Sequence, residues 1–336
     1  MRASKKKVIS QKPAIRKVVF IISFKHSGST LLGFLLGANK DCFNLGEFTK
    51  AKERQKTLSK KCLVCDNYCK LWAAFKRNLK TTTKRHLYEA AFETFKKPIL
   101  IDTSRKWAWV KSASSRINCE SKIIFLTRNE RDRLSFHQRF GDGITRAIVE
   151  RQARGVTRTK RWLKNRKYLQ VKYENVCNKN ALKRCCKFIG IEYDEKMFRY
   201  WETLQHALEG NSRTASLMKK WHNLSIGNPT ALKFIEEHGL KVKAIKSKEK
   251  WTKKEKKVFT KYGGANANKL LGYKEDGLAK KKPVMEKLVK KKPISYKKHM
   301  KRVFKVAHRI KINKQAKKIA KTKKECEKYV KMIRKQ

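Results

Sequence analysis

The chain has 336 residues, of which 88 are Lys or Arg and 27 are Asp or Glu, so its formal net charge is +61. This length suffices for one sizeable α/β domain with appendages or for two small domains. This charge favours association with polyanions such as nucleic acid, anionic lipid or acidic polysaccharide, and it does not specify the fold. The alternative explanation is a host whose proteins are generally rich in Lys, or an environment that is rich in nucleic acid. No run of about 18 uncharged apolar residues occurs, so no transmembrane helix is expected.

Residues 1–16 form a basic leader that we expect to be disordered. With the apolar residues 18–24 it superficially resembles a signal peptide, but that apolar part has only about eight residues and runs straight into a turn of small residues. We therefore interpret residues 18–24 as a buried strand. A chain without an export signal is expected to be cytoplasmic, with its nine cysteines in a reducing compartment.

Four short apolar segments rich in Val, Ile and Phe predict strands that are buried on both faces of a parallel sheet. They span residues 18–24, 98–102, 121–127 and 168–174. Helical patterns lie between them or follow them, over residues 30–38, 83–95, 104–114, 130–140 and, with a Gly stop in the middle, 178–202. This alternation predicts a doubly wound α/β domain over about residues 17–205.

After residue 205 the sequence is helical and polar up to residue 273, and a Lys-rich tail follows at 274–336. The tail carries 25 Lys and Arg against 5 Asp and Glu, a net charge of +20. Two Pro residues interrupt it before an amphipathic pattern. We expect a solvated arm, helical or disordered, that binds polyanions non-specifically.

A turn of small and basic residues, KHSGST, connects the first predicted strand to the first predicted helix. Small residues let backbone N–H groups converge on an anion, and a helix N-terminus adds its dipole. Ser27, Ser29 and Thr30 add hydroxyl donors, while Lys25 and His26 add positive charge. The Walker pattern GxxxxGK[ST] is absent, which argues against a kinase or ATPase. The turn predicts an anion site; the alternative is a tight turn before a capped helix.

Together with later segments, this turn resembles the phosphosulfate loop of sulfotransferases that use 3′-phosphoadenylyl sulfate (PAPS). The segments follow the family's order and are KHSGSTLL (25–32), NLGE (44–47), ILIDTSRKWAW (99–109), KIIFLTRNERDRLS (122–135), VKYENV (171–176), EGNSR (209–213) and W…LLGY (251–273). The resemblance implies a three-layer, P-loop-like sulfotransferase domain over residues 17–273. It also implies transfer of a sulfuryl group from PAPS, which leaves as adenosine 3′,5′-bisphosphate.

The resemblance also assigns roles to residues. The phosphosulfate would be held by Lys25, His26, Ser27, Gly28, Ser29, Thr30 and Leu31. Lys25 and His26 would stabilise the charge that develops on the bridging oxygen. Arg128 and Ser135 would hold the 3′-phosphate, because Arg suits a two-pronged contact with phosphate oxygens.

Two departures from the family pattern affect these assignments. His26 stands where the family usually has Arg, so one cation becomes pH-dependent near neutrality, and Lys25 could take over its role. The spacing from Arg128 to Ser135 is one residue shorter than usual. If Ser135 misses the phosphate, a basic residue of the same helix would compensate, and the candidates are Arg131, Arg133 and Arg139.

The acceptor hydroxyl must lose its proton during attack, which calls for a nearby base. Glu47 is the first candidate, because it follows the first helix on the expected acceptor side. The alternative is that Glu47 is an exposed surface residue. His137, after the phosphate motif, is the second candidate, and neither His206 nor His222 has a stronger claim.

The segment KCLVCDNYCKLW places Cys62, Cys65 and Cys69 within eight residues. Cys-x2-Cys is a zinc half-site, and Cys42 or His86 could complete four ligands. No second Cys-x2-Cys follows, so we assign no metal, and zinc binding by these cysteines stays the alternative. A similar Cys-rich loop occurs in some members of the family, and we interpret residues 60–72 as a structural insert near the acceptor side, in thiol form. The adjacent cysteines at 185 and 186 are expected in the core.

The leading hypothesis is therefore a PAPS-dependent sulfotransferase with a hydroxyl acceptor, or an amine. A carbohydrate fits best, because a growing sulfated glycan is anionic and the chain is strongly basic. A small alcohol, a phenol and peptidyl tyrosine remain open. The alternative is a polyanion- or nucleic-acid-binding protein on a degenerate sulfotransferase scaffold. A nucleotide kinase is disfavoured by the missing P-loop Lys.

Overall fold

The computed structural model describes residues 15–53, 55–65, 68–81, 87–139, 143–226, 229–238 and 251–274. All of them belong to one compact unit, Met1–Lys282. The predicted leader and Lys-rich tail lie almost entirely outside the described residues. Within the described part of the chain, no helix combines the length and the apolar character needed to cross a membrane.

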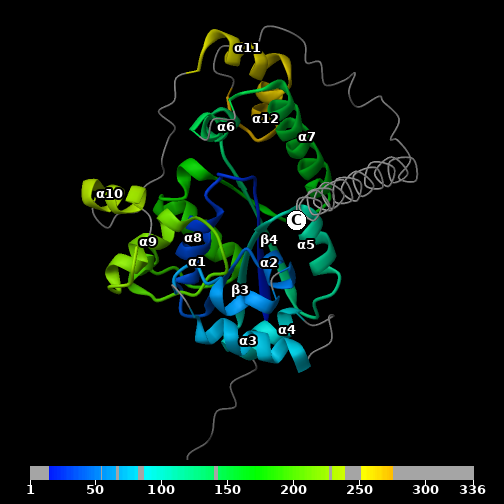
Figure 1. Cartoon of the computed structure of the whole chain (residues 1–336). Helices are drawn as coiled ribbons and strands as arrows, with labels where there is room; N and C mark the ends of the chain where they lie inside the picture. Colours follow the sequence, from blue (N-terminus) through cyan, green and yellow to red (C-terminus); the bar gives the residue numbers. More distant parts are fainter. Residues whose placement is uncertain are drawn as a thin grey trace, which may run out of the picture. The chain divides into compact units, whose positions relative to one another are not determined.

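A five-stranded, fully parallel sheet forms the centre of the domain (Figure 1). Its strands are β1 (Lys17–Ile22), β2 (Cys42–Gly46), β3 (Ile99–Arg105), β4 (Glu120–Thr127) and β5 (Leu169–Lys172). Their order is β2-β3-β1-β4-β5, so β1 lies at the centre. In the register of the sheet, Val18 is opposite Leu100 on one side and Ser121 on the other.

Helices pack on both faces of this sheet and make the domain three-layered. The first half contains α1 (Ser29–Gly37), α2 (Thr49–Glu53), η1 (Gln55–Lys60), α3 (Lys70–Thr81), α4 (Leu87–Phe95), α5 (Trp107–Ser114) and α6 (Glu130–Arg139). The second half contains α7 (Arg146–Leu163), η2 (Tyr173–Asn175), α8 (Lys179–Ile189), η3 (Glu195–Glu202), α9 (Ser212–Trp221), α10 (Pro229–His238), α11 (Lys253–Lys261) and α12 (Gly264–Leu270). In Figure 1, α1, α8 and α9 lie to the left of the strands and α5 to the right.

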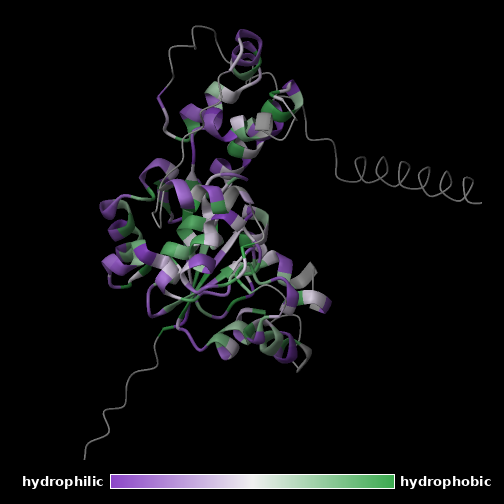
Figure 2. Cartoon of the chain, turned by 60° about the vertical axis from the view of Figure 1, so that its left-hand side comes forward, coloured by the Kyte–Doolittle hydropathy of each residue, from purple (hydrophilic) through white to green (hydrophobic). Residues whose placement is uncertain are grey.

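The core follows from the strand sequences. Successive side chains of a strand point to opposite faces, so a strand that is apolar throughout needs cover on both. Residues 18–22 of β1 are at most 1 % exposed, and Figure 2 shows hydrophobic colour concentrated along the strands. The predicted doubly wound α/β class is confirmed.

Several element boundaries differ from the prediction. β1 ends at Ile22 rather than at residue 24, because the chain turns at residues 24–27, where Ser27 N–H donates to the Phe24 carbonyl at 3.1 Å. β3 continues to Arg105, so α5 begins at Trp107 rather than at residue 104. The start of the predicted helix 83–95 lies outside the described residues, and α4 begins at Leu87.

The elements that were not predicted from the sequence are β2, α2, η1, α3 and α7. β2 has the sequence CFNLG, and its Asn and Gly are depleted in strands, so propensity argued against it. α7 is an 18-residue helix that buries Val149, Ala153, Val156 and Leu163. Their spacing of 4, 3 and 7 residues is a helical period, and this signal could have identified α7 from the sequence.

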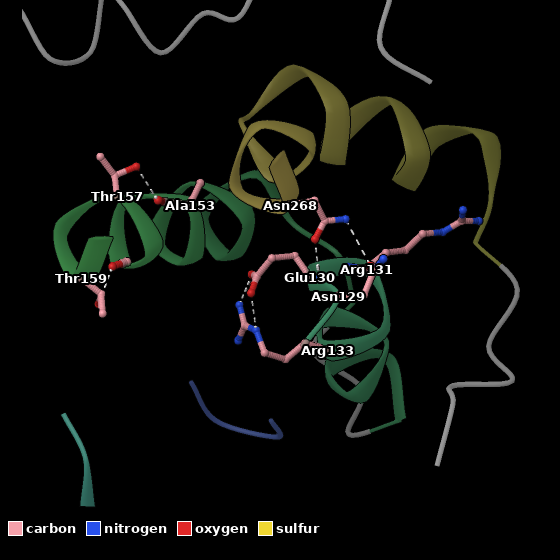
Figure 3. Close-up of polar contacts among 9 residues, drawn as sticks. Asn129, Glu130, Arg131, Arg133, Ala153, Thr157, Thr159 and Asn268 are labelled. Carbon is pink, nitrogen blue, oxygen red and sulfur yellow. Dashed lines mark hydrogen bonds and ion pairs between the residues drawn. The ribbon is translucent and has the colours of Figure 1, made fainter. Parts of the chain in front are cut away.

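A second, smaller hydrophobic cluster joins α6, α7 and α11. Its buried members are Leu134, Ile144, Val149, Trp251 and Phe259. Polar bonds complete the junction with α12, where Asn268 Oδ1 accepts from Glu130 N–H at 2.7 Å and Asn268 Nδ2 donates to Asn129 Oδ1 at 3.1 Å (Figure 3). The junction fixes the start of α6, which directly follows the turn that contains Arg128.

Candidate functional site

The strand order places a topological switch point at the carboxyl ends of β1 and β4. After β1 the chain runs through α1 to the edge strand β2, whereas after β4 it runs to the opposite edge strand β5. In open α/β sheets, ligands bind where such neighbouring connections diverge. The two predicted phosphate segments meet at this point, because Arg128 Nη1 donates to the His26 carbonyl at 3.0 Å.

The predicted anion loop connects β1 to α1, and two of its residues lie in the left-handed backbone region. His26 has φ 66° and Gly28 has φ 85°, and Gly28 is the N-cap of α1. The first turn of α1 contains no acidic residue, and no side chain caps its N-terminus. The positive end of the helix dipole therefore faces the loop without a fixed negative partner on the helix itself.

Two buried hydroxyls belong to the segment between β1 and α1. The Ser27 side chain belongs to a residue that is 1 % exposed, and Ser23 is 5 % exposed. Among the described residues, neither hydroxyl has a hydrogen-bond partner. A buried polar group left without a partner costs about 1–3 kcal/mol, so a bound anion would relieve a real penalty here.

The glycine at position 28 is required both by conformation and by space. A Cβ at Gly28 would lie 2.4 Å from Tyr173 Cδ2, a severe clash. At Gly272, φ is +77° and a Cβ would meet nothing within 4 Å. Gly272→Ala should lower the unfolding free energy by about 1–2 kcal/mol, because a residue with a Cβ is strained in the left-handed backbone region. Gly28→Ala should lower the unfolding free energy by more than this, because its Cβ would also displace the Tyr173 ring.

Denaturant titration of both glycine variants measures these losses of unfolding free energy. Equal losses would contradict the steric role of Gly28 against Tyr173. A larger loss of unfolding free energy in Gly28→Ala than in Gly272→Ala would support this role.

Arg128 is a buried cation held between two aromatic rings. It is 2 % exposed, and its guanidinium carbon lies 4.2 Å from the Tyr173 ring centre and 4.9 Å from that of Phe136. Burial lowers the pKa of Arg128, against the opposing effect of nearby acidic groups, Tyr173 first and then Asp132. The His26 ring stacks on the other aromatic, Phe136, at 4.9 Å and 9°. Phe136 therefore contacts both His26 and Arg128.

Sequence reasoning did not single out Phe136 and Tyr173. Tyr173 belongs to a segment that carried the family resemblance and Phe136 directly follows another, but an aromatic residue at such a place is not by itself a functional signal. Their role emerges from geometry, since each ring face lies over the Arg128 guanidinium. Cation–π contacts of this kind stabilise a cation that has been removed from water.

Ser135, the second predicted 3′-phosphate ligand, lies on α6 and is 2 % exposed. Its hydroxyl accepts from Trp251 Nε1 at 2.7 Å and donates to the Arg131 carbonyl at 2.9 Å. These bonds tie α6 to the segment before α11. A phosphate ligand role for Ser135 stays a prediction.

The basic residues of α6 point in different directions. Arg133 is fully buried and pairs with the carboxylate of Glu130 (Figure 3). The guanidinium of Arg131 lies 5.5 Å from the Trp251 ring centre. The side chains of Arg139 and His137 lie outside the described part of the structure.

Glu47 lies at the carboxyl edge of the sheet, directly after β2. Its Oε2 accepts from Arg105 Nη2 at 2.7 Å, and the two side chains are 16 % and 26 % exposed respectively. The alternative of an exposed surface residue is therefore wrong. The Glu47 N–H donates to the Leu208 carbonyl at 2.7 Å, which fixes the backbone beneath the carboxylate. Its action as a base stays a prediction.

A buried carboxylate supports the neighbouring turn. Asp102 is 1 % exposed and accepts from Tyr88 Oη at 2.5 Å, Trp109 Nε1 at 2.9 Å and the backbone and hydroxyl of Ser104. Burial raises the pKa of Asp102, and these hydrogen bonds oppose the rise. The Ser104 hydroxyl in turn accepts from Thr49 N–H at 2.9 Å. This network holds the end of β3 against the start of α2, two residues from Glu47.

A segment distant in sequence lies beside these groups. Residues 206–211, here called the strap, pair through Leu208 with Gly46 at the end of β2. The strap then reaches the anion loop, where Asn211 N–H donates to Thr30 Oγ1 at 3.1 Å. Asn211 also caps α9, accepting from Thr214 N–H at 3.1 Å. The segment EGNSR is thus placed next to KHSGST.

The remaining loop residues take up places consistent with backbone contacts to an anion. Lys25 is exposed at the turn, while Ser29 is 7 % and Leu31 is 9 % exposed in the first turn of α1. Leu31 can contribute its backbone N–H alone. The structure therefore gathers Lys25–Leu31, Arg128 and Glu47 at the carboxyl edge of the sheet.

Neither the protein-family models nor the curated proteins contain a match to this chain. The solved structures that are similar to it include two sulfotransferase domains. A sulfotransferase domain from the curacin biosynthetic pathway shares 17 % identity at a TM-score of 0.45, covering 67 % of this chain and 98 % of that one. A sulfotransferase domain from the Synechococcus PCC 7002 olefin synthase shares 19 % identity at a TM-score of 0.42, covering 69 % and 99 %. These likenesses lie below the level that identifies a function, so the function is inferred from the site's residues.

Proposed function

We propose that the chain transfers a sulfuryl group from PAPS to a hydroxyl acceptor and releases adenosine 3′,5′-bisphosphate. The observation that carries the proposal is the junction of the two predicted phosphate segments. Arg128 contacts the His26 carbonyl at 3.0 Å, beside a Ser27 hydroxyl that has no partner among the described residues. A cation, a helix N-terminus and unused hydroxyls at one loop fit a ligand with several anionic groups.

The 3′-phosphate separates PAPS from ordinary adenylates, and Arg128 is the group proposed to recognise it. Its guanidinium is fixed between Tyr173 and Phe136 before any ligand binds. A planar, preorganised fork loses little freedom on contacting phosphate oxygens. Other basic residues on the surface attract anions without this fixed geometry.

Sulfuryl transfer requires two charge movements. The bond between sulfur and the bridging oxygen breaks, and negative charge develops on that oxygen of the departing 5′-phosphate. Lys25, His26 and the N–H groups at the start of α1 are the groups proposed to stabilise it. The acceptor hydroxyl forms the new bond to sulfur and gives its proton to Glu47, whose carboxylate is oriented by Arg105.

A carbohydrate hydroxyl is the acceptor class that we favour. The chain carries a net charge of +61, and a sulfated glycan gains negative charge with every transfer. Long-range attraction would therefore raise the local concentration of a partly sulfated chain. An acceptor screen across glycans, phenols and small alcohols tests this preference.

Calorimetric titration with adenosine 3′,5′-bisphosphate tests the nucleotide site. We expect micromolar binding at about 0.3 M salt, where non-specific attraction is screened, and much weaker binding of 5′-AMP and ATP. Similar, weak and salt-sensitive binding of all three would contradict the proposal. It would instead support a polyanion-binding protein on this fold, for which the net charge of +61 is the favouring observation.

Arg128→Ala should weaken bisphosphate binding by roughly 10- to 100-fold, the loss expected for charge-assisted hydrogen bonds. The matched control is Arg116→Ala, which removes the same charge from an exposed residue before β4, at the amino end of that strand. Affinity should change little in that variant. Equal losses in the two variants would show that general charge, and not Arg128, binds the nucleotide.

A further inference from the structure

We propose that Cys62, Cys65, Cys69 and His206 bind one structural zinc ion. The four ligand atoms, three Sγ and one imidazole nitrogen, all lie within 4.8 Å of one another. Cys62 and Cys69 are buried, while Cys65 and His206 are half-buried. The metal site does not depend on the proposed sulfotransferase activity.

The distances fit a tetrahedral zinc centre. His206 Nδ1 lies 3.9 Å from Cys62 Sγ, 3.3 Å from Cys65 Sγ and 3.5 Å from Cys69 Sγ. With Zn–S near 2.3 Å and Zn–N near 2.0 Å, tetrahedral angles place sulfur and nitrogen ligands about 3.5 Å apart. One imidazole nitrogen can form a hydrogen bond with only one of the three thiols around it. A metal ion at the centre would instead bind all four ligand atoms.

The donor set indicates which metal and which role. Thiolate and imidazole ligands favour zinc over magnesium or calcium, which prefer oxygen. Three cysteines and one histidine fill all four positions of a tetrahedral site and leave none open for substrate. A closed site of this kind is structural rather than catalytic.

The local fold holds the ligands in place before the metal binds. Cys65 N–H donates to Cys62 Sγ at 3.4 Å, as in a turn that wraps around an ion. Cys69 N–H donates to the Ser59 carbonyl at 2.8 Å, and Cys69 directly precedes α3. Trp72 Nε1 donates to the His206 carbonyl at 2.6 Å, which anchors the residue that supplies the fourth ligand.

The zinc would fasten the Cys-rich insert to the strap. Leu63 N–H donates to the Ala207 carbonyl at 2.8 Å, and Glu209 N–H donates to the Lys61 carbonyl at 3.2 Å. The same strap accepts from Glu47 N–H through Leu208 and donates to Thr30 through Asn211. The ion would therefore stabilise the backbone beneath Glu47 and beside the anion loop, a positioning role that rests on the proposed function.

This proposal departs from the expectation drawn from the sequence, which assigned no metal. The fourth ligand considered there was Cys42 or His86. Cys42 lies in β2 and is not part of the cluster of described residues, and His86 is outside them. His206 is 137 residues from Cys69, so no local spacing could have indicated it.

Metal analysis of the full-length chain, purified without a polyhistidine tag, tests the site. We expect about one zinc per chain after dialysis, because a closed four-ligand site binds tightly. Cys65→Ser and His206→Asn should each lower the zinc content several-fold. Cys177→Ser changes a half-buried cysteine outside the cluster and should keep the wild-type content. A metal-free wild type, iron in place of zinc, or unchanged zinc in both cluster variants would overturn the proposal.

Cobalt substitution keeps the test decisive if the cluster variants fail to fold. The wild-type chain loaded with Co²⁺ should show the intense visible absorption of tetrahedral cobalt together with thiolate-to-cobalt charge transfer. One equivalent of Zn²⁺ should abolish both. A weak, octahedral cobalt spectrum would overturn the proposal even where bisphosphate binding succeeds, so failure of the metal site is distinguishable from failure of the proposed function.

Discussion

Glu47→Gln should reduce turnover by on the order of 10² or more while leaving the affinity for adenosine 3′,5′-bisphosphate nearly unchanged. The amide keeps the shape of the side chain but cannot take the acceptor's proton at neutral pH. In the proposed site the bisphosphate contacts the loop after β1 and Arg128, so its binding should not require the Glu47 carboxylate. Steady-state sulfuryl transfer from PAPS and calorimetric titration of the bisphosphate measure the two quantities separately.

The control for Glu47→Gln is Glu120→Gln, the same change at the amino end of β4, where the side chain is 38 % exposed. It should leave both turnover and affinity close to wild type. Unchanged turnover in Glu47→Gln would exclude Glu47 as the base. A parallel loss of bisphosphate affinity would show that its contact with Arg105, at 2.7 Å, organises the whole site instead.

Glu130→Gln should lower the free energy of unfolding by about 3–5 kcal/mol, the loss typical when one partner of a buried ion pair is removed. Arg133 has no exposed side-chain area, and Glu130 Oε1 accepts from Arg133 Nε at 2.8 Å. Neutralising Glu130 leaves the guanidinium buried with only the Phe24 ring, at 5.3 Å, as a further electrostatic partner among the contacts described. Denaturant titration measures the loss.

The control for Glu130→Gln is Glu195→Gln, which breaks the exposed pair with Lys179. Because both of its side chains are more than half exposed, it should not change stability measurably. The double variant Glu130→Gln, Arg133→Met should recover part of the loss, since it removes the buried charge as well. A loss in Glu130→Gln no larger than in Glu195→Gln would contradict a stabilising role for the buried pair.

The α/β class and four of the five strands follow from local sequence pattern. An apolar run without alternation requires cover on both faces, and this requirement does not depend on distant residues. The anion loop is also local, because a strand, a small-residue turn and a helix start are adjacent in the chain. For the same reason the start of α1 was predicted within one residue.

Tertiary structure decided which distant groups meet. β2 is a strand because it pairs with β3 and packs against α1, although residues such as Asn44 and Gly46 are depleted in strands. On α6, packing alone turned Arg133 into the interior toward Glu130, whereas sequence had grouped it with Arg131. The sequence by itself determined the chemistry available at each turn. Only the fold brought Glu47 to Arg105 and His206 to the three cysteines, because contacts between such distant positions depend on strand order and not on local spacing.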